Sequence, residues 1–513
     1  MTFSQLSTYF EKLEATSSRL ALIDILADLF KHVAKQEIDK VIYLMQGRIA
    51  PFYEATEIGM ADKTIATALA QAFGEKREHV LKMYARKGDM GLVAQELNSK
   101  FKIQNSKLNV EEVFNTLTQI AKTSGEGTVG KRTAFFADLL RKLDSTSVKY
   151  LARVGLGNLR LGIGDPTVLD GLALAILKDR YKRKLLEKAY NETSDLGIIG
   201  KTLLEGGLKA VQKLTVTVGR PIRSELCERL PDPAKIMEKF GGLAHVQYKF
   251  DGFRTELHKN GDEVRIFSRN LEETTAMLPE IVEGVKKQVK AETVILDAEA
   301  LAFNPASDEF LPFQETTKRR RKYGVEEMSK SMPLKSFVFD IMYLNGQSLI
   351  DLPLKDRLKK LAEVVKGDEV LIPQPGEMVN KAQRLQEIFD DAITKGLEGL
   401  VVKKPDSPYQ AGGRNFNWVK LKRHSSGELK DTIDVVLLGY IFGRGKRAEF
   451  GAGSLLVGVY DQENDEFVTV SKIGTGLTDE EWKEVHKRAD KISVDKKPAR
   501  VNAVMEHSVW IKP

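Results

Sequence analysis

Apolar side chains recur at helical spacing from the start of the chain to about Lys213. One such helical face comprises Leu20, Ile23, Ala27 and Phe30. Ser17 and Ser18 precede it, and serine favours helix N-termini because its hydroxyl accepts a hydrogen bond from a free backbone N–H. Few β-rich runs interrupt this pattern. We therefore expect an all-α domain over residues 1–215.

After Gly219-Arg220-Pro221 the pattern changes to short alternating runs, separated by turn signals such as Asn260-Gly261 and Asn345-Gly346. Alternation with period two predicts strands, and Asn-Gly pairs predict hairpin turns. The pattern indicates an α+β domain over residues 216–427. A last alternating segment begins at about Glu428 and has Gly-rich turns between Gly443 and Gly453. It predicts a small all-β unit over residues 428–513.

Composition changes this picture only modestly. The 513 residues carry 79 basic and 72 acidic side chains, and the formal charge of +7 favours anionic partners without requiring them. Cys227 is the only cysteine, which excludes an intrachain disulfide and a cysteine-rich zinc site. The apolar run from Leu20 to Phe30 is broken by Asp24 and Asp28. We therefore expect neither a signal peptide nor a membrane span, and a cytoplasmic protein.

The run Lys249-Phe250-Asp251-Gly252-Phe253-Arg254 is the first candidate for chemistry. Side chains alternate along a strand, so Gln247 and Lys249 share one face and Val246, Tyr248 and Phe250 share the other. Lys249 then leaves the core and points into a site. Arg254 begins a hairpin whose return strand ends at Ser268-Arg269-Asn270, which places Arg254 and Arg269 near its mouth.

Three further runs repeat the alternation. Asp297 and Glu299 share one face of a predicted strand, and adjacent carboxylates repel unless a cation lies between them, so we expect a divalent metal or a lysine there. Glu398 directly precedes an apolar strand. Lys420 and Lys422 share one face of another strand, and Arg414 precedes them in a Gly-rich loop. These side chains would gather charge on polar strand faces.

Two loops of the helical region combine glycine with basic or hydroxyl side chains. The first contains Arg153, Arg160, Gly162 and Gly164, and the second contains Ser124 and Gly125. Such loops can present backbone N–H groups and guanidinium groups to phosphates. On local sequence alone, turns between helices with solvated charges explain them equally well.

Each run by itself is a weak signal. A Lys-x-Asp-Gly sequence occurs by chance in many proteins, and paired acids or paired lysines more often form a solvated strand face. Five such elements in order favour phosphoryl or nucleotidyl transfer instead. In that chemistry a neutral lysine attacks, cations hold phosphate oxygens, and carboxylates hold Mg²⁺.

The ordered set resembles the covalent nucleotidyltransferase superfamily. Nearly the whole chain is most similar to the ATP-dependent DNA ligases of the archaeal and eukaryotic replicative type. Lys249-x-Asp251-Gly252-x-Arg254 is similar to the first motif of that family, which implies that Lys249 forms a phosphoramide with AMP from ATP. The implied fold is multidomain, with an all-α DNA-binding domain, an α+β nucleotidyltransferase (adenylation) domain and a β-barrel OB-fold domain.

The resemblance also implies roles for single residues. Arg254 and Arg269 would bind ribose and phosphates, Glu299 the ribose or metal, Phe339 the adenine ring, and Glu398 the metal. Lys420 and Lys422 would hold the α-phosphate, with Arg414 beside the nucleotide. Gln247 would meet adenine, although the family often has an acidic residue there. Mg²⁺ or Mn²⁺ is the implied metal.

The implied substrate is nicked double-stranded DNA, gripped by a monomer mainly through its backbone, in replication, repair and recombination. The loops at 124–128 and 155–164 resemble the phosphate-gripping loops of the family. Gln104 opens a stretch that lacks the aromatic pair of a sliding-clamp peptide, which argues against clamp binding.

The family's OB-fold domain usually ends in a basic motif, Arg-x-Asp-Lys or similar, that orients pyrophosphate. The printed sequence ends at Trp510-Ile511-Lys512-Pro513 without it, so we expect an OB-fold domain that is incomplete at its C-terminus. The sequence is then either a fragment, or a chain in which reaction with ATP is impaired. For the chain as printed we expect slow adenylation by ATP and preserved sealing of a pre-adenylated nick.

Other functions share part of the pattern. An RNA ligase or an mRNA-capping guanylyltransferase would also use Lys249, but the long helical region argues against both. An NAD-dependent ligase needs a zinc module with several cysteines. A nick-binding scaffold without catalysis would fit the absent last motif, but the remaining catalytic positions are filled.

Overall fold

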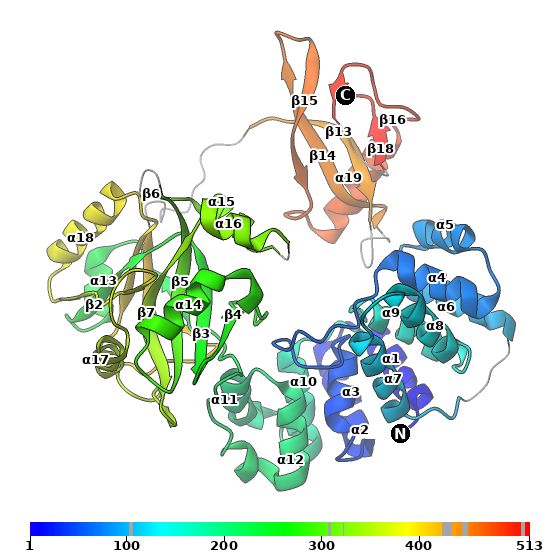
Figure 1. Ribbon diagram of the computed structural model, residues 1–513. Coiled ribbons are helices and arrows are strands. Elements are labelled where there is room, and N and C mark those ends of the chain that lie inside the picture. The colour runs from blue at the N-terminus through cyan, green and yellow to red at the C-terminus, as the bar shows by residue number, and fades with distance from the viewer. Residues whose placement is uncertain (102–105, 306–308, 322, 423–432, 444–449, 504–507) are drawn as a thin grey trace.

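The computed structural model describes the chain except for residues 102–105, 306–308, 322, 423–432, 444–449 and 504–507. Figure 1 shows a helical body at the N-terminus, a mixed body with two β-sheets, and a C-terminal sheet that stands apart from both. This multidomain arrangement agrees with the expectation from the sequence. Within the described ranges, no helix is both long and apolar enough to cross a membrane.

The helical domain packs around a single apolar core that runs from Phe3 to Val211. Its helices are α1 (Phe3–Glu14), α2 (Arg19–His32), α3 (Ile38–Met45), α4 (Asp62–Phe73), α5 (Arg77–Lys87), α6 (Met90–Asn98), α7 (Val110–Lys122), α8 (Thr128–Leu140), α9 (Ser145–Gly155), α10 (Asp165–Leu177), α11 (Arg183–Thr193) and α12 (Leu196–Val211). The backbone of α12 is interrupted at Gly207. The helical pattern of the sequence is confirmed.

Helix α2 tests the sequence prediction in detail. Ser18 is its N-cap, and the Ser18 hydroxyl accepts a hydrogen bond from the backbone N–H of Ala21. Ile23, Ala27 and Phe30 are buried as predicted. Leu20 also belongs to this helix, but it lies in the first turn and is 56% exposed.

Two β-sheets form the middle domain. One sheet has the strand order β1 (Leu226–Arg229), β12 (Arg414–Lys422), β11 (Gly399–Lys403), β2 (Ala244–Lys249) and β10 (Glu377–Val379). The other has the order β4 (Glu263–Ser268), β3 (Phe253–Asn260), β5 (Thr293–Asn304), β7 (Leu334–Leu344) and β8 (Gln347–Ser348), with β6 (Glu309–Phe310) beside β5 and β9 (Leu371–Pro373) beside β7. The chain passes from the first sheet to the second directly after Lys249.

Helices cover the outer faces of these sheets and complete two apolar cores. They are α13 (Pro233–Lys239), α14 (Pro279–Gln288), α17 (Leu354–Val364) and α18 (Ala382–Thr394). Two short helices, α15 (Phe313–Thr316) and α16 (Val325–Ser331), follow β6 and add no residue to either core. Helix α14 packs on the sheet of β3 and β5, and α13 and α18 pack on the sheet of β2 and β11. The two sheet faces that these helices do not cover carry polar side chains.

Both predicted hairpin turns are present, with one shift of register. Asn345 and Gly346 both have positive φ between the paired residues Leu344 and Gln347, as a type I′ turn requires. In the other hairpin Asn260 pairs with Glu263, so the two turn residues are Gly261 and Asp262 rather than Asn260 and Gly261. Gly261 supplies the positive φ at the first of these positions.

The C-terminal unit is a sheet with the order β16 (Ser493–Val494), β18 (Ser508–Ile511), β13 (Val436–Phe442), β14 (Ala452–Asp461), β15 (Glu466–Ile473) and β17 (Val501–Asn502). Helix α19 (Asp479–Asp490) packs Trp482 against it. Within the described residues the pairing ends at β16 and β17, so a closed barrel stays a prediction. The predicted boundary at Glu428 lies outside the described residues, as do Gln104 and residues 444–449.

The helical and middle domains contact each other beside β1. The guanidinium of Arg223, just before β1, lies 3.0 Å from Oδ2 of Asp165 on α10 and donates to the Tyr190 hydroxyl at 2.7 Å. The rings of Tyr53 and Phe267 meet edge to face, 6.5 Å between centroids. These contacts fix the helical domain next to the mouth of the β3–β4 hairpin.

Candidate active site

A cavity of about 400 Å³ is lined by residues from both sheets of the middle domain. Its walls contain every nucleotide-site residue that the sequence predicted except Glu398: Gln247, Lys249, Arg254, Arg269, Glu299, Phe339, Arg414, Lys420 and Lys422. Its charged side chains are mostly basic, since Lys403 and Arg320 also line it. Such a lining suits a polyanionic ligand.

Strand register explains why so many cations gather on one face. Lys249, Gly399 and Lys422 lie side by side across β2, β11 and β12. The next rung on that face contains Gln247, Val401 and Lys420, and the one after contains His245, Lys403 and Trp418. The alternate residues, such as Val246, Leu400 and Leu421, are buried in the core behind. The alternation predicted for Lys420 and Lys422 is therefore confirmed.

Lys249 is held by Glu398. Its Nζ lies 2.5 Å from Oε2 of Glu398, and the backbone N–H of Glu398 donates to the Lys249 carbonyl at 3.1 Å. The other carboxylate oxygen of Glu398 pairs with Lys422. Gly399 makes this approach possible, because its φ of +141° and the carbonyl of Leu421 leave no room for a Cβ.

Aromatic packing supports the turn after Lys249. The rings of Phe250 and Phe337 stack with centroids 3.8 Å apart, and Leu301 completes this small cluster. Phe250 follows the last residue of β2 and lines the cavity, so the predicted core face holds for Val246 but does not extend to Phe250. A turn anchored in this way restricts the directions that Lys249 can take.

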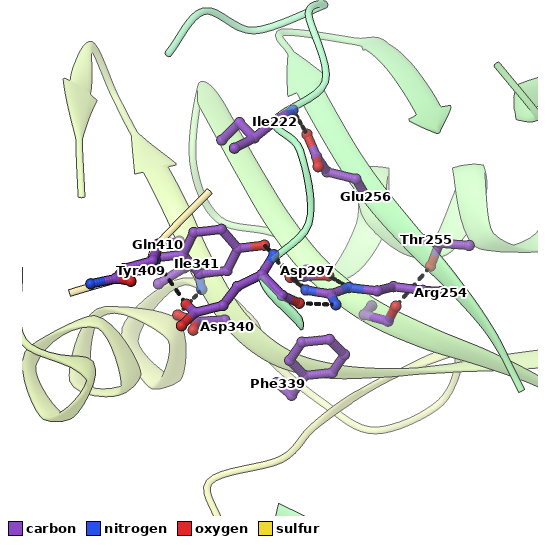
Figure 2. A network of polar contacts seen from close by, with 12 residues as sticks. Ile222, Arg254, Thr255, Glu256, Asp297, Phe339, Asp340, Ile341, Tyr409 and Gln410 are labelled. Atoms are coloured by element: carbon purple, nitrogen blue, oxygen red, sulfur yellow. Dashed lines mark hydrogen bonds and ion pairs between the residues drawn. The ribbon is translucent and has the colours of Figure 1, made fainter. Parts of the chain in front are cut away.

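Arg254 is not a free cation at the cavity wall (Figure 2). Its Nε donates to Oδ1 of Asp297 at 2.8 Å, and one Nη2 N–H donates to Oδ2 of the same carboxylate. The Nη1 atom donates to the carbonyl of Glu225 at 2.6 Å, and Nη2 also donates to the Tyr409 hydroxyl at 3.1 Å. The cation beside Asp297 is thus an arginine, where the sequence suggested a metal or a lysine.

Glu299 lies opposite Arg254 across the β3–β5 ladder and faces the same cavity. Burial raises the pKa of the Glu299 carboxyl to about 7, while the nearby charges of Lys249 and Arg254 oppose that rise. Partial burial lowers the pKa of Lys420 and of Lys422. The cavity therefore holds several groups whose charge responds to a bound anion or cation.

The deep end of the cavity is aromatic. The rings of Phe339 and Trp418 meet edge to face at 6.2 Å, and Lys403 Nζ lies 3.8 Å from the Trp418 centroid. Burial lowers the pKa of Lys403 to about 8. Gln247 Nε2 donates to the carbonyls of Phe339 and Gln374, at 3.2 and 2.6 Å. This fixes the Gln247 amide and leaves its buried Oε1 without a partner among the described residues.

The candidate DNA-contact residues of the helical domain differ in exposure. Ser124 and Gly125 lie exposed in the turn before α8, and Gly162 and Gly164 lie exposed in the turn before α10. Arg160 is partly exposed, and its Nη1 is 2.7 Å from Asp89. The four small residues are thus exposed, whereas the Arg160 guanidinium is already paired.

Arg153 is buried in a network of ion pairs, whereas the sequence predicted a side chain available to DNA phosphates. Only 4% of its side chain is exposed, and Nη2 lies 2.7 Å from Asp89 and 3.0 Å from Glu14. The guanidinium also donates to the carbonyl of Leu159. These contacts join α1, α6 and α9, so Arg153 has no free face for a phosphate.

Comparison with known proteins identifies this architecture. The family model described as the ATP dependent DNA ligase domain matches residues 224–422, which contain the cavity. The DNA ligase N terminus matches residues 2–173, and the ATP dependent DNA ligase C terminal region matches residues 448–513. The chain belongs to the ATP-dependent DNA ligases.

Named relatives cover the full chain. The "Probable DNA ligase" of Dictyoglomus turgidum is 47% identical over 100% of this chain and 88% of its own length. The "DNA ligase" of Sulfolobus acidocaldarius is 40% identical over the same shares. A solved structure titled "Pmar-Lig_PreS3" matches with a TM-score of 0.53 and 16% identity, covering 95% of this chain and 91% of that chain, and so shares the fold.

Several residues that line the cavity of this ligase, or that bond to its lining, were not singled out from the sequence. Lys403 could have been found, because it lies two residues after Val401 and so shares the strand face that Lys249 occupies. Tyr409 and Glu225 could not, because they lie outside any regular pattern and reach Arg254 only through the fold. Cys227 and Arg320 also line the cavity.

The two acids predicted as metal ligands suit a hard divalent cation in this ligase. Glu299 faces the cavity, and Glu398 is held by two lysines that line it. No group of three acidic, histidine or cysteine side chains that could enclose an ion occurs among the described residues. Mg²⁺ usually takes one or two carboxylates together with water and substrate phosphates, so this donor set fits it.

Proposed function

We propose that this ligase joins the 3′-hydroxyl and 5′-phosphate at nicks in duplex DNA through an AMP carried on Lys249. The observation that carries the proposal is the placement of Lys249 beside Glu398 and in one rung with Lys422, at the wall of a basic cavity with an aromatic end. A nucleophile, phosphate-binding cations and a site for a flat base are thereby combined.

The reaction would proceed in three transfers. Lys249 Nζ attacks the α-phosphorus of ATP, a P–N bond forms, and pyrophosphate leaves. The 5′-phosphate of the nick then attacks the same phosphorus, which releases Lys249 and leaves AMP on the DNA end. The 3′-hydroxyl finally attacks the 5′-phosphorus, and AMP departs as the phosphodiester bond forms.

The first transfer requires that Lys249 lose a proton. Oε2 of Glu398, at 2.5 Å, is the acceptor within reach. Lys422 shares that carboxylate and Lys420 lies on the next rung, so both can neutralise charge on the α-phosphate. Glu299 and Glu398 would hold the Mg²⁺, which when bound neutralises phosphate charge and aids the leaving group.

The aromatic end would bind adenine. Phe339 offers a ring face for stacking, and the free Oε1 of Gln247 is an acceptor that suits the exocyclic amine of adenine rather than the carbonyl of guanine. Arg254 would form a fixed wall near the ribose, and Arg269 and Arg414 would lie nearer the phosphates.

We further propose that residues 1–215 grip the duplex, residues 216–427 carry the chemistry, and residues 428–513 form an OB-fold domain. Exposed glycines at 125, 162 and 164 would meet backbone phosphates, which gives little sequence preference. The proposed protein is a cytoplasmic monomer that closes nicks left by replication, repair and recombination.

A nick-sealing assay tests the proposal. A duplex with a labelled 5′-phosphate at a nick is incubated with Mg²⁺ and ATP, NAD or GTP, and a second duplex carries AMP on that phosphate. We expect sealing with ATP but not with NAD or GTP. Lys249→Ala should seal only the pre-adenylated nick. No sealing of either duplex by the unaltered chain would contradict the proposal.

A further inference from the structure

Tyr409 lies at the centre of the polar network in Figure 2, although it does not line the cavity. It comes from the segment between β11 and β12, and it is 4% exposed. Its ring packs edge to face against Trp418, 5.6 Å between centroids. The packed ring has few other positions available, so it fixes the position of the Tyr409 hydroxyl in the network.

The hydroxyl of Tyr409 uses all of its hydrogen-bonding capacity. It donates to Oδ2 of Asp297 at 2.9 Å and accepts from Arg254 Nη2 and from the backbone N–H of Glu225, both at 3.1 Å. A tyrosine hydroxyl has one proton to donate and lone pairs for two donors. Burial raises the pKa of Tyr409 well above its usual range, so the hydroxyl keeps its proton.

Arg254 in turn has almost no free donors. A guanidinium carries five N–H groups. Nε and one Nη2 N–H bond to Asp297, the other Nη2 N–H bonds to Tyr409, and one Nη1 N–H bonds to the Glu225 carbonyl. Within the described structure, a single N–H on Nη1 is left for a ligand in the cavity that Arg254 lines.

We propose that Tyr409 is a positioning residue for the nucleotide site, whose hydroxyl locks the Arg254–Asp297 pair so that Arg254 presents one fixed N–H to the bound nucleotide. This inference rests on the proposed function of the cavity. Without the hydroxyl, Arg254 gains a free Nη2 N–H, Asp297 loses a donor and the pair can rotate. Part of the binding free energy of the nucleotide is then used to fix the orientation of the Arg254–Asp297 pair, which Tyr409 otherwise fixes before binding.

Tyr409→Phe removes the hydroxyl and keeps the ring on Trp418. The rate of AMP attachment is measured against ATP concentration for the unaltered chain, for this variant and for Tyr343→Phe. Tyr343 is a matched control, because it lies in β7 of the same domain and does not line the cavity. We expect the KM for ATP to rise about tenfold in Tyr409→Phe, with the rate at saturating ATP changed by less than about threefold. Tyr343→Phe should match the unaltered chain.

A purely structural role would lower the melting temperature and leave KM unchanged, and that result would overturn the proposal. The path through Arg254 is tested by Arg254→Lys alone and combined with Tyr409→Phe. If Tyr409 acts through Arg254, the double variant has the KM of Arg254→Lys alone, whereas independent effects would multiply.

Two further results keep the inference separate from the proposed function. If Tyr409→Phe does not fold, Asp297→Asn is measured in the same way, and an unchanged KM there contradicts the lock. If the unaltered chain forms no AMP adduct at all, the proposed function fails, and the inference fails with it. If the unaltered chain forms the adduct but Tyr409→Phe leaves the KM for ATP unchanged, only the inference fails.

Discussion

The Nζ atom of Lys249 lies 2.5 Å from Oε2 of Glu398, and Lys422 pairs with the other oxygen of that carboxylate. This arrangement makes Glu398 the partner of the proposed nucleophile and of a lysine proposed to bind phosphate. The two ion pairs of Glu398 depend on the close approach of β11 to β2 and β12.

Glu398→Gln removes the negative charge but keeps the shape of the side chain. We expect AMP attachment to slow about 100-fold, because the proton acceptor for Lys249 is lost. Single-turnover adenylation over a range of Mg²⁺ concentrations measures this. Glu377→Gln is the control, since Glu377 pairs with Arg384 in an exposed contact. Equal rates in the two variants would contradict the role of Glu398.

Gly399→Ala tests the backbone that positions Glu398. A Cβ at this φ of +141° would overlap the carbonyl of Leu421 in the neighbouring strand. We expect a loss of about 3 kcal/mol in the free energy of unfolding, or a displaced β11 with slower adenylation. Gly130→Ala in α8 is the control, because no atom lies within 4 Å of its added Cβ. Thermal melting compares them, and equal midpoints would argue against the close approach.

Glu225 gives a pH dependence of stability. Burial raises the pKa of this fully buried carboxyl to about 7, from 4.5. Between these values the folded state holds a proton that the unfolded state has released, so the free energy of unfolding falls as the pH rises. Glu225→Gln stays neutral at every pH. We expect it to match the unaltered chain near pH 4.5 and to be about 2–3 kcal/mol more stable above pH 7.

Urea denaturation at about pH 5 and about pH 8 checks this difference. Glu326→Gln serves as the control, since Glu326 is exposed on α16. A Glu225→Gln variant that is no more stable than the unaltered chain at the higher pH would show that the carboxyl is readily charged in the fold.

Arg153 and Arg160 should behave differently despite their nearby places in the sequence. Arg153→Ala leaves Asp89 without its main partner in a buried site, so we expect a loss of about 3–5 kcal/mol in stability. Arg160→Gln removes a second, partly exposed partner of Asp89, so we expect a smaller loss of stability than in Arg153→Ala. It should also weaken binding to nicked DNA, with a salt dependence reduced by about one ion. Melting curves and salt titrations of binding distinguish them. Similar effects of both changes on DNA binding alone would restore Arg153 as a phosphate contact.

The sequence predicted the parts of the site that follow from local periodicity. Lys249, Lys420 and Lys422 lie on polar strand faces because a period of two leaves no other choice once Val246 and Leu421 are buried. Local periodicity could not predict which residues distant along the chain would contact each other. Tyr409 lies 155 residues from Arg254 along the chain, and Asp89 lies 64 residues from Arg153. The sequence alone does not show whether a basic side chain will be buried beside a distant carboxylate or left exposed.

The most direct test of the central claim is the location of the AMP. The unaltered chain is incubated with ATP and Mg²⁺ to completion, digested and examined by mass spectrometry, beside a folded Lys249→Ala variant. The account predicts AMP on the peptide that contains Lys249, through a bond labile to acid, and no adduct in the variant. AMP on another residue, or an adduct that persists in Lys249→Ala, would contradict it.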